Sequence, residues 1–241
     1  MILLLAGTTE AREMAARLAR SGVAAEALLA GAVADPLPLD LPTRIGGFGG
    51  EDGFRAFLAD KGVTAVIDAT HPFAARITAR TARVCADLGL PHCILCRPAW
   101  QAGAGDDWRE VSTPEDLPRV IPAGARIFLS VGRGEVGRYA GLKGRTVVLR
   151  SIDPPRELPD PDWQVVTGRP PFSVEDEKAL FALTGIDWLV TKNAGGASGT
   201  AKLAAARTLG LPVAMIARPS LPEGATVVGT VEAAMDWVRA L

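Results

Sequence analysis

The 241-residue chain has little of several features that define common protein classes. Its three cysteines, Cys85, Cys93 and Cys96, are too few and odd in number for a disulfide framework. No apolar run approaches the length of a membrane span, and no charged segment with a cleavage site opens the chain. A formal net charge of −1 provides no global basic field. We therefore expect a cytoplasmic protein that binds neither nucleic acid nor a membrane.

The best-known nucleotide and metal motifs are missing as well. The turn after the first apolar run has one glycine, Gly7, where G-x-G-x-x-G would have three. The stretch "TKNAGGASGTAK" (191–202) is rich in glycine but lacks P-loop spacing, so NTP hydrolysis is not supported. Cys93 and Cys96 have redox or zinc spacing, but no second pair completes a zinc site. We expect buried thiols and no metal site.

What the sequence does contain is a regular alternation of short apolar runs with helical patterns, in a chain that is 48% hydrophobic. Strands are expected at 2–6, 24–30, 63–67, 92–96, 126–131, 145–149, 187–191, 212–216 and 225–228, and helices near 10–21, 51–61, 73–89, 134–141, 175–184 and 198–209. Continuous apolar runs separated by helices are typical of parallel strands buried on both faces. The sequence predicts an α/β fold.

The pattern restarts part-way along the chain. "RIFLSVGRGEV" repeats the opening order of apolar strand, glycine-bearing turn and helix, and 97–125 before it is rich in Pro, Gly and Asp. We expect two Rossmann-like halves, 1–108 and 109–241, with mostly parallel sheets and a ligand cleft between them. Ligands of such sheets bind beyond the carboxyl ends of the strands, so the candidate site residues should follow strands.

Two strand ends of the first half carry candidate cofactor-binding residues. After the first strand, Gly7 to Glu10 open a helix, whose free N–H groups and dipole attract anions. The alternative is that Thr8 or Thr9 only caps that helix. In "VIDATHPFAARI" (66–77), Asp68 and His71 could transfer a proton or bind a nucleotide edge. The alternative there is a capping Asp68 and a His71 that only hydrogen-bonds the loop.

Two strand ends of the second half carry candidate substrate-binding residues. They lie in "SVGRGEV" (130–136) and in "TKNAGGASGTAK", where Lys192 falls directly at a strand tip. The second stretch also has a structural interpretation, as a long connection or a helix C-cap. We favour ligand binding because of Lys192.

Four phrases together resemble one family. "GTTEAR", "DATHPFA", "RPAW" and "TKNAGG" occur in order along nearly the whole chain and are similar to the precorrin-6A reductases, NADPH-dependent enzymes of cobalamin biosynthesis. One departure is Ala194, where many relatives would have serine. The resemblance implies NADPH between two Rossmann-like domains with the tetrapyrrole above the nicotinamide. It implies hydride transfer to one carbon of a C=C bond and a proton to its neighbour, and it assigns no catalytic side chain.

The expected site residues are then as follows. Cofactor binding is expected of Gly7, Thr8, Thr9, Glu10, Arg44, Gly46, Gly47, Asp68, Ala69, Thr70, His71 and Pro72. Substrate binding is expected of Ser130, Arg133, Lys192, Asn193, Gly195 and Gly196. Because a precorrin carries many carboxylates, basic residues at strand ends should gather at the site: Arg76, Arg97, Arg133, Lys192 and Arg218.

NADPH is expected over NADH for a reason that the residues themselves give. NAD-specific sites usually place a carboxylate at the tip of the second strand, but here Glu26 comes too early and Asp35 too late, beyond Gly31, Ala32 and Val33. Arg44, just before the glycines of "RIGGFGG", could approach a 2′-phosphate. The alternative is that this loop only packs.

Other functions on the same fold remain open at this point, because fold does not fix function. One is a nucleotide-binding sensor or interaction module without tetrapyrrole chemistry. Another is a short-chain reductase with a Tyr-x-x-x-Lys pair; Tyr139 and Lys143 have that spacing, but Gly141 and Gly144 interrupt the helix that the pair needs. A transfer contact with neighbouring pathway enzymes is a further expectation of the reductase interpretation.

Overall fold

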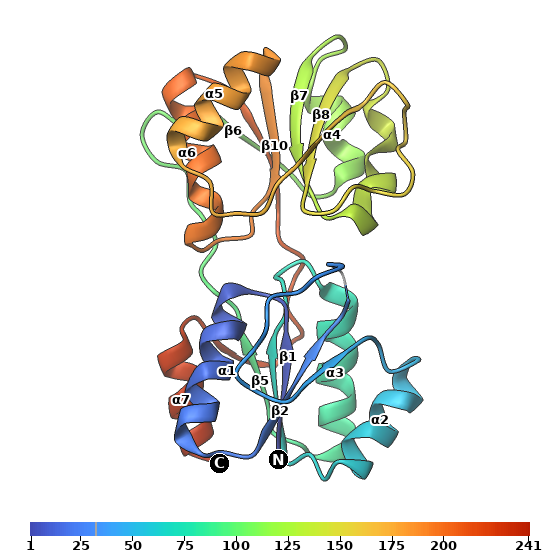
Figure 1. Ribbon diagram of the computed structural model, residues 1–241, viewed down its shortest axis with the longest axis vertical. Coiled ribbons are helices and arrows are strands. Elements are labelled where there is room, and N and C mark those ends of the chain that lie inside the picture. Colours follow the sequence, from blue (N-terminus) through green and yellow to red (C-terminus); the bar gives the residue numbers. More distant parts are fainter. Residues whose placement is uncertain (32) are drawn as a thin grey trace. The chain divides into compact units, whose positions relative to one another are not determined.

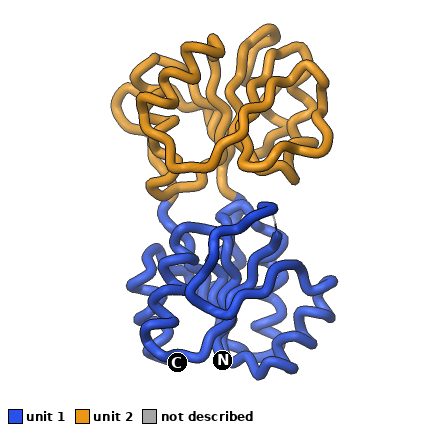
Figure 2. The backbone as a smooth tube through the Cα atoms, viewed as in Figure 1, with its two compact units in different colours: residues 1–98, 219–241 blue, residues 99–218 orange. Residues whose placement is uncertain are grey.

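The structure is a computed structural model that describes residues 1–31 and 33–241 (Figure 1). The chain forms two compact units (Figure 2). Unit 1 comprises residues 1–98 and 219–241, and unit 2 comprises residues 99–218. Each unit is built on one six-stranded sheet in which every pair of neighbouring strands is parallel. The predicted α/β fold with two Rossmann-like halves is confirmed.

Unit 1 has the strand order β12-β5-β4-β1-β2-β3. Its strands are β1 (Ile2–Ala6), β2 (Ala25–Leu29), β3 (Thr43–Ile45), β4 (Ala65–Ala69), β5 (His92–Leu95) and β12 (Thr226–Val228). Its helices are α1 (Thr9–Ser21), α2 (Glu51–Asp60), α3 (Ala75–Leu88) and α7 (Val231–Arg239). Helices α1 and α7 cover one face of the sheet, and α2 and α3 cover the other (Figure 1).

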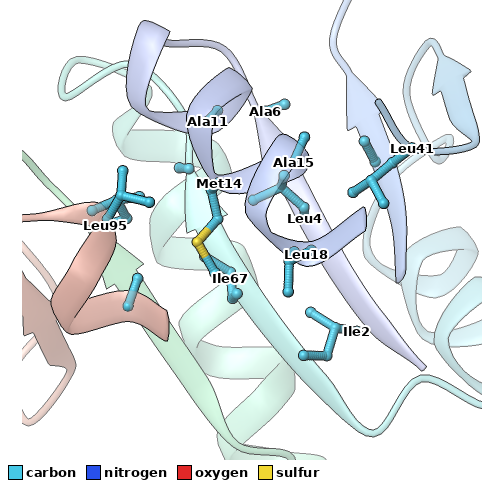
Figure 3. Packing of buried hydrophobic residues seen from close by; sticks show 14 of the residues in the cluster. Ile2, Leu4, Ala6, Ala11, Met14, Ala15, Leu18, Leu41, Ile67 and Leu95 are labelled. Carbon is cyan, nitrogen blue, oxygen red and sulfur yellow. The ribbon is translucent and has the colours of Figure 1, made fainter. Parts of the chain in front are cut away.

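The opening run "ILLLA" is apolar without a break because both faces of β1 are covered. Ile2, Leu4 and Ala6 belong to the core under α1 and α7. Leu3 and Leu5 belong to the opposite core, under α2 and α3. Figure 3 shows the first core, where Met14, Ala15 and Leu18 of α1 pack over the sheet with Ile67 of β4.

Unit 2 has the strand order β6-β11-β10-β7-β8-β9. Its strands are β6 (Trp108–Val111), β7 (Arg126–Ser130), β8 (Thr146–Ser151), β9 (Gln164–Thr167), β10 (Trp188–Lys192) and β11 (Val213–Ile216). Its helices are α4 (Leu117–Val120), α5 (Val174–Thr184) and α6 (Thr200–Leu209), with 3₁₀ helices η1 (Pro114–Asp116), η2 (Arg133–Leu142) and η3 (Ala197–Gly199). Helices α5 and α6 lie side by side over a core that includes Phe128, Phe181 and Leu189.

All nine expected strands are present, but β3, β6 and β9 were not expected. These three strands lie at sheet edges, and most of their residues are exposed or half-buried, so they lack the apolar run that marks the central strands. The expected helix at 134–141 is the 3₁₀ helix η2, and helix α7 was missed.

The division of the chain differs from the expected one at residue 108. The chain leaves unit 1 after Pro98 and returns to it at Pro219. Two edge strands explain the difference: β12, near the C-terminus, pairs with β5 of unit 1, whereas β6, which follows β5 in sequence, pairs with β11 of unit 2. Helix α7 then packs on α1. Unit 1 thus takes its sixth strand from near the C-terminus, whereas the six strands of unit 2, β6 to β11, are consecutive in the chain.

Candidate functional site

Both sheets have a topological switch point. In unit 1 the chain builds β1, β2 and β3 in one direction and then continues with β4 on the other side of β1. Unit 2 repeats this with β7, β8 and β9, followed by β10 beside β7. Ligands of open α/β sheets bind beyond the carboxyl ends of the strands at such points. The four loops chosen from the sequence are the loops that follow β1, β4, β7 and β10.

In unit 1 the loops after β1 and β4 lie backbone against backbone. A Cβ added to Gly7 would lie 3.4 Å from the His71 nitrogen and 3.5 Å from the Thr70 Cα. These are ordinary van der Waals distances, so the two backbones lie side by side with no free space between them. The two expected cofactor loops are thus direct neighbours at the switch point of unit 1.

Thr8 and Thr9 have different roles in the turn. Thr8 is the N-cap of α1: its Oγ1 accepts a hydrogen bond from the Ala11 N–H at 3.1 Å and donates one to the Ala69 carbonyl at 3.0 Å. The capping alternative therefore describes Thr8. Thr9 is the first residue of α1 and is exposed. Its hydroxyl has no hydrogen-bond partner among the described residues, so it is free for a ligand at the positive end of the helix.

The Glu10 side chain forms an ion pair with Arg97. Its carboxylate is 2.5 Å from the Arg97 guanidinium, and the two side chains are 22% and 10% exposed, respectively. Arg97 follows β5 and was expected among the free basic residues of the site. Because the two charges compensate each other, this ion pair fixes the start of α1 and leaves little net charge there.

Asp68 and His71 form contacts within their own loop. The Oδ1 of buried Asp68 accepts hydrogen bonds from the backbone N–H and the hydroxyl of Thr70, at 3.0 and 2.6 Å, while its Oδ2 is buried without a partner among the described residues. The His71 Nδ1 accepts from the Phe73 N–H at 3.3 Å. An accepting Nδ1 is unprotonated, so this contact favours a neutral imidazole with its proton on Nε2.

Arg44 lies on β3, beside the end of β2. It pairs with Leu28 near the end of β2, and the next residues, Ile45 and Gly46, continue along the same strand end. Its guanidinium carbon lies 5.5 Å from the Phe57 ring and 5.9 Å from the Phe48 ring. Arg44 is exposed and forms no ion pair with any described residue.

The Glu26 carboxylate does not lie at the end of β2. Glu26 lies at the start of β2, bound to Lys61 at 3.0 Å. Gly47 is exposed beside Gly46. Ala32, part of the tip considered in the sequence, lies outside the described residues.

In unit 2 both expected cations are paired with carboxylates. Arg133, at the start of η2, lies 3.4 Å from Asp153. Lys192, at the end of β10, binds Glu135 of η2. Lys192 is buried, and burial lowers the pKa of its ammonium group while Glu135 opposes that change. Ser130 ends β7 and pairs in register with Arg150 of β8.

The side-chain amide of Asn193 is hydrogen-bonded within the protein. Its Oδ1 accepts from the Trp100 N–H at 2.8 Å, and its Nδ2 donates to the Trp100 carbonyl at 3.0 Å. The Trp100 indole donates to the Gly196 carbonyl at 2.8 Å. Arg218 donates to the carbonyls of Asn193 and Ala194, at 2.7 and 2.9 Å. The turn after β10, which continues through Gly195, is thus fixed by Trp100 and Arg218.

A family model described as "Precorrin-6x reductase CbiJ/CobK" matches residues 1–239 of the chain. This chain belongs to the precorrin-6x reductase family. The precorrin-6A reductase of Rhodococcus erythropolis is 45% identical over 243 residues, covering 100% of this chain and 98% of the relative. That of Rhodobacter capsulatus is 42% identical, covering 98% and 95%. The family resemblance carried by the four short phrases is confirmed.

A solved structure and a further relative are also similar to this member of the precorrin-6x reductase family. A solved structure of CobK precorrin-6A reductase superimposes with a TM-score of 0.93 at 42% identity, covering 99% of this chain and 96% of that chain. The cobalt-precorrin-6A reductase of Priestia megaterium is 30% identical, covering 96% and 95%. Across residues 1–31 and 33–241, no helix has the length and apolarity to cross a membrane.

Several residues near the strand ends of this family member were not singled out from the sequence. They include Trp100 as the partner of Asn193, and the buried pair of Arg150 and Glu177, whose atoms meet at 2.7 and 2.8 Å. Arg150 directly follows the expected strand at 145–149, so a basic residue at a strand end was the signal that could have found it. The phrase "RPAW" was a signal for Trp100, but its contact with "TKNAGG" is visible only in the fold.

Two further features, a buried tyrosine and a cavity, do not belong to the expected site residues. The only tyrosine, Tyr139, is 1% exposed, and burial raises the pKa of its phenol. A cavity of about 350 Å³ in unit 1 lies between α3 and residues 219–223, with Pro72 at its edge. Its lining from α3 is mostly alanine, so it offers few groups for recognising a polar ligand.

Proposed function

We propose that this protein is a precorrin-6A reductase of cobalamin biosynthesis. In the proposed reaction, NADPH gives a hydride to one carbon of a C=C bond of the precorrin macrocycle, and a proton goes to the neighbouring carbon. The observation that carries the proposal is the match to the reductase family over residues 1–239, with relatives above 40% identity covered almost end to end.

We place the cofactor at the carboxyl ends of β1, β2 and β4. The turn of Gly7, Thr8, Thr9 and Glu10 and the loop of Asp68, Ala69, Thr70, His71 and Pro72 flank the switch point of unit 1. The close approach at Gly7, the free Thr9 hydroxyl and the N-terminus of α1 suit a pyrophosphate. When bound, the reduced nicotinamide supplies the hydride, and these residues bind and orient the cofactor.

The choice of NADPH over NADH rests on Arg44. Its guanidinium is exposed, forms no ion pair with a described residue, and is held by two aromatic rings beside the end of β2. An exposed arginine that forms no ion pair among the described residues favours a 2′-phosphate. Gly46 and Gly47 leave the strand end open beside it.

We place the substrate carboxylates at the strand ends of unit 2, with Ser130, Arg133, Lys192, Gly195 and Gly196. Arg133 and Lys192 now bind Asp153 and Glu135, so a substrate carboxylate would replace one anionic partner by another. During such an exchange, the positive charge of the buried Lys192 always has a carboxylate partner. Asn193 serves by holding Trp100 and the turn. Product transfer to a neighbouring pathway enzyme stays a prediction.

The decisive experiment follows NADPH absorbance on addition of precorrin-6A in the absence of oxygen. We expect loss of NADPH in proportion to the macrocycle added, and a slower reaction with NADH. Cofactor binding without any consumption would overturn the proposal in favour of a nucleotide sensor. Mass spectrometry of the product should show the gain of two hydrogens, which separates true reduction from NADPH oxidation by a contaminant.

A further inference from the structure

Lys202 occupies an unusual position for a lysine. It is the third residue of α6, it is half-buried, and its ammonium group has no hydrogen-bond or ion-pair partner among the described residues. A Cβ added to Gly199 would lie 3.2 Å from the Lys202 Nζ. The side chain therefore turns back to the first residue before the helix, in the direction that helical side chains take.

The surroundings of this ammonium group carry excess positive charge. The charged groups that act on it are Arg150 of β8 and Glu177 of α5. Both carboxylate oxygens of Glu177 are engaged by the Arg150 guanidinium, at 2.7 and 2.8 Å. Arg150 is also stacked on the Phe172 ring, 4.0 Å from its centre. Glu177 thus compensates Arg150 and leaves Lys202 without a counter-ion.

The N-terminus of α6 adds to this positive region. The N-cap is Gly199, and no side-chain hydrogen bond caps the ten-residue helix. The Thr200 N–H donates to the Ala197 carbonyl of η3, so the N–H groups after Thr200 form the positive end of the helix. Glycine is required at 199 because a Cβ would lie 2.5 Å from the Trp100 ring. The ring also lies 5.6 Å from the Lys202 Nζ, and Trp100 is fixed by its hydrogen bonds to Asn193 and Gly196.

We propose that Lys202 and the N-terminus of α6 form an anion-binding site that takes one carboxylate or phosphate group of a ligand. The site rests on the proposed function, which supplies both kinds of group: carboxylates on the precorrin and phosphates on NADPH. An anion here would provide the counter-ion that the free protein lacks. The ring of Trp100 forms a rigid wall beside it.

The site has a distinctive pH dependence. Burial, followed by the charge of Arg150, lowers the pKa of Lys202 to about 8, and Glu177 opposes this only in part. The ammonium form of Lys202 binds the anion, and the bound negative charge raises the pKa of Lys202. The affinity for the anion is therefore highest at pH values below the pKa of Lys202 in the free protein. Above that pKa it falls by up to about tenfold per pH unit, until the pKa of Lys202 in the complex is reached.

The test compares three variants of the full chain. Lys202→Met removes the charge, Lys202→Arg retains it at all accessible pH values, and Lys143→Met removes an exposed lysine of the same unit as a control. The dissociation constant of NADP⁺ and the KM of precorrin-6A are measured across the pH range around the lowered pKa. Lys202→Met should weaken one of the two ligands by about tenfold or more. Lys202→Arg should restore that affinity without its fall at high pH.

The two ligands distinguish the source of the anion. A weaker NADP⁺ complex assigns a cofactor phosphate, and a raised KM for precorrin-6A assigns a substrate carboxylate. If neither changes in a folded Lys202→Met protein, the site is overturned. In case that variant does not fold, ¹³C-methylation of the wild-type lysines provides a second measurement, with the Lys202 signal identified by its loss in Lys202→Arg.

In this second measurement, the signal of Lys202 should move to a higher pKa when NADP⁺ or precorrin-6A is added. A signal that moves with neither ligand overturns the site even in an active enzyme, which leaves the proposed reaction standing. A wild-type protein that does not reduce precorrin-6A overturns the proposed reaction instead, whatever NADP⁺ does to Lys202.

Discussion

The side-chain amide of Asn193 is hydrogen-bonded on both sides to the backbone of Trp100, at 2.8 and 3.0 Å. The amide is buried, and both of its polar atoms are engaged. Asn193 directly follows β10, whereas Trp100 lies just inside unit 2 after the chain leaves unit 1. An asparagine at a strand tip, which the sequence suggested for substrate binding, therefore acts first as a support.

Asn193→Ala is expected to lower the free energy of unfolding by about 1–3 kcal/mol, because it leaves the half-buried N–H and carbonyl of Trp100 without these partners. Urea denaturation followed by tryptophan fluorescence measures the change. An unchanged unfolding free energy together with a raised KM for precorrin-6A would instead make Asn193 a direct substrate ligand.

Substitutions of the two neighbouring threonines, Thr8 and Thr9, should have different effects, the first on stability and the second on cofactor binding. Thr8→Ala removes the N-cap of α1 and should cost about 0.5–2 kcal/mol of unfolding free energy, whereas Thr8→Ser retains the capping oxygen and serves as its control. Thr9→Ala removes a free hydroxyl and should leave stability within about 0.5 kcal/mol while weakening NADPH binding. Calorimetric titration measures the affinity; wild-type affinity in Thr9→Ala would leave this turn with a structural role alone.

Arg44 should decide between the two nicotinamide cofactors. The wild type is expected to prefer NADP⁺ over NAD⁺ by about tenfold or more, equivalent to about 1.4 kcal/mol, since the guanidinium has no carboxylate partner to displace among residues 1–31 and 33–241. Arg44→Ala should abolish that preference in competition binding without affecting NAD⁺. Arg20→Ala, which removes an exposed arginine from the last turn of α1, is the matched control. A preference for NAD⁺ in the wild type would contradict the assignment.

His71 is expected not to be an essential proton donor. Its Nδ1 accepts a hydrogen bond from the Phe73 N–H, an arrangement that a doubly protonated ring would lose. His71→Ala should keep measurable turnover, and His71→Asn, whose amide oxygen can replace Nδ1 as the acceptor, should stay closer to wild type. A fall in kcat of more than about 10⁴-fold in both variants would exceed the usual contribution of general acid catalysis and reverse this assignment.

The strands at the centre of each sheet could be predicted because burial on both faces leaves a continuous apolar run. β1 and β4 are buried at all five positions; the apolar run of β1 is unbroken, and that of β4 is interrupted only by Asp68. The edge strands β3 and β9 have mostly exposed residues and few neighbours to select an apolar pattern. What identifies them is pairing with the next strand, which is a property of the folded sheet.

The candidate site divides in a similar way. That Gly7 and Lys192 follow strands was visible in the sequence, since a strand end is a local feature. That Glu10 binds Arg97, or Lys192 binds Glu135, was not, because the partners are far apart along the chain and each is an ordinary charged residue. The strand ends identified the four loops, but neither they nor the likeness to a known family distinguished the supporting Asn193 from ligand-binding neighbours.

The position of β12 has a consequence for biogenesis. A ribosome makes the first 98 residues of unit 1 long before it makes Thr226–Val228 and α7. Until then the nascent sheet has an open edge at β5, and the apolar side of α1 around Met14 lacks the helix that packs against it. We expect the early domain to mature only after all of unit 2 has been translated. A ribosome stalled before residue 219 should therefore hold a protease-sensitive first domain, even though that domain contains the expected cofactor loops.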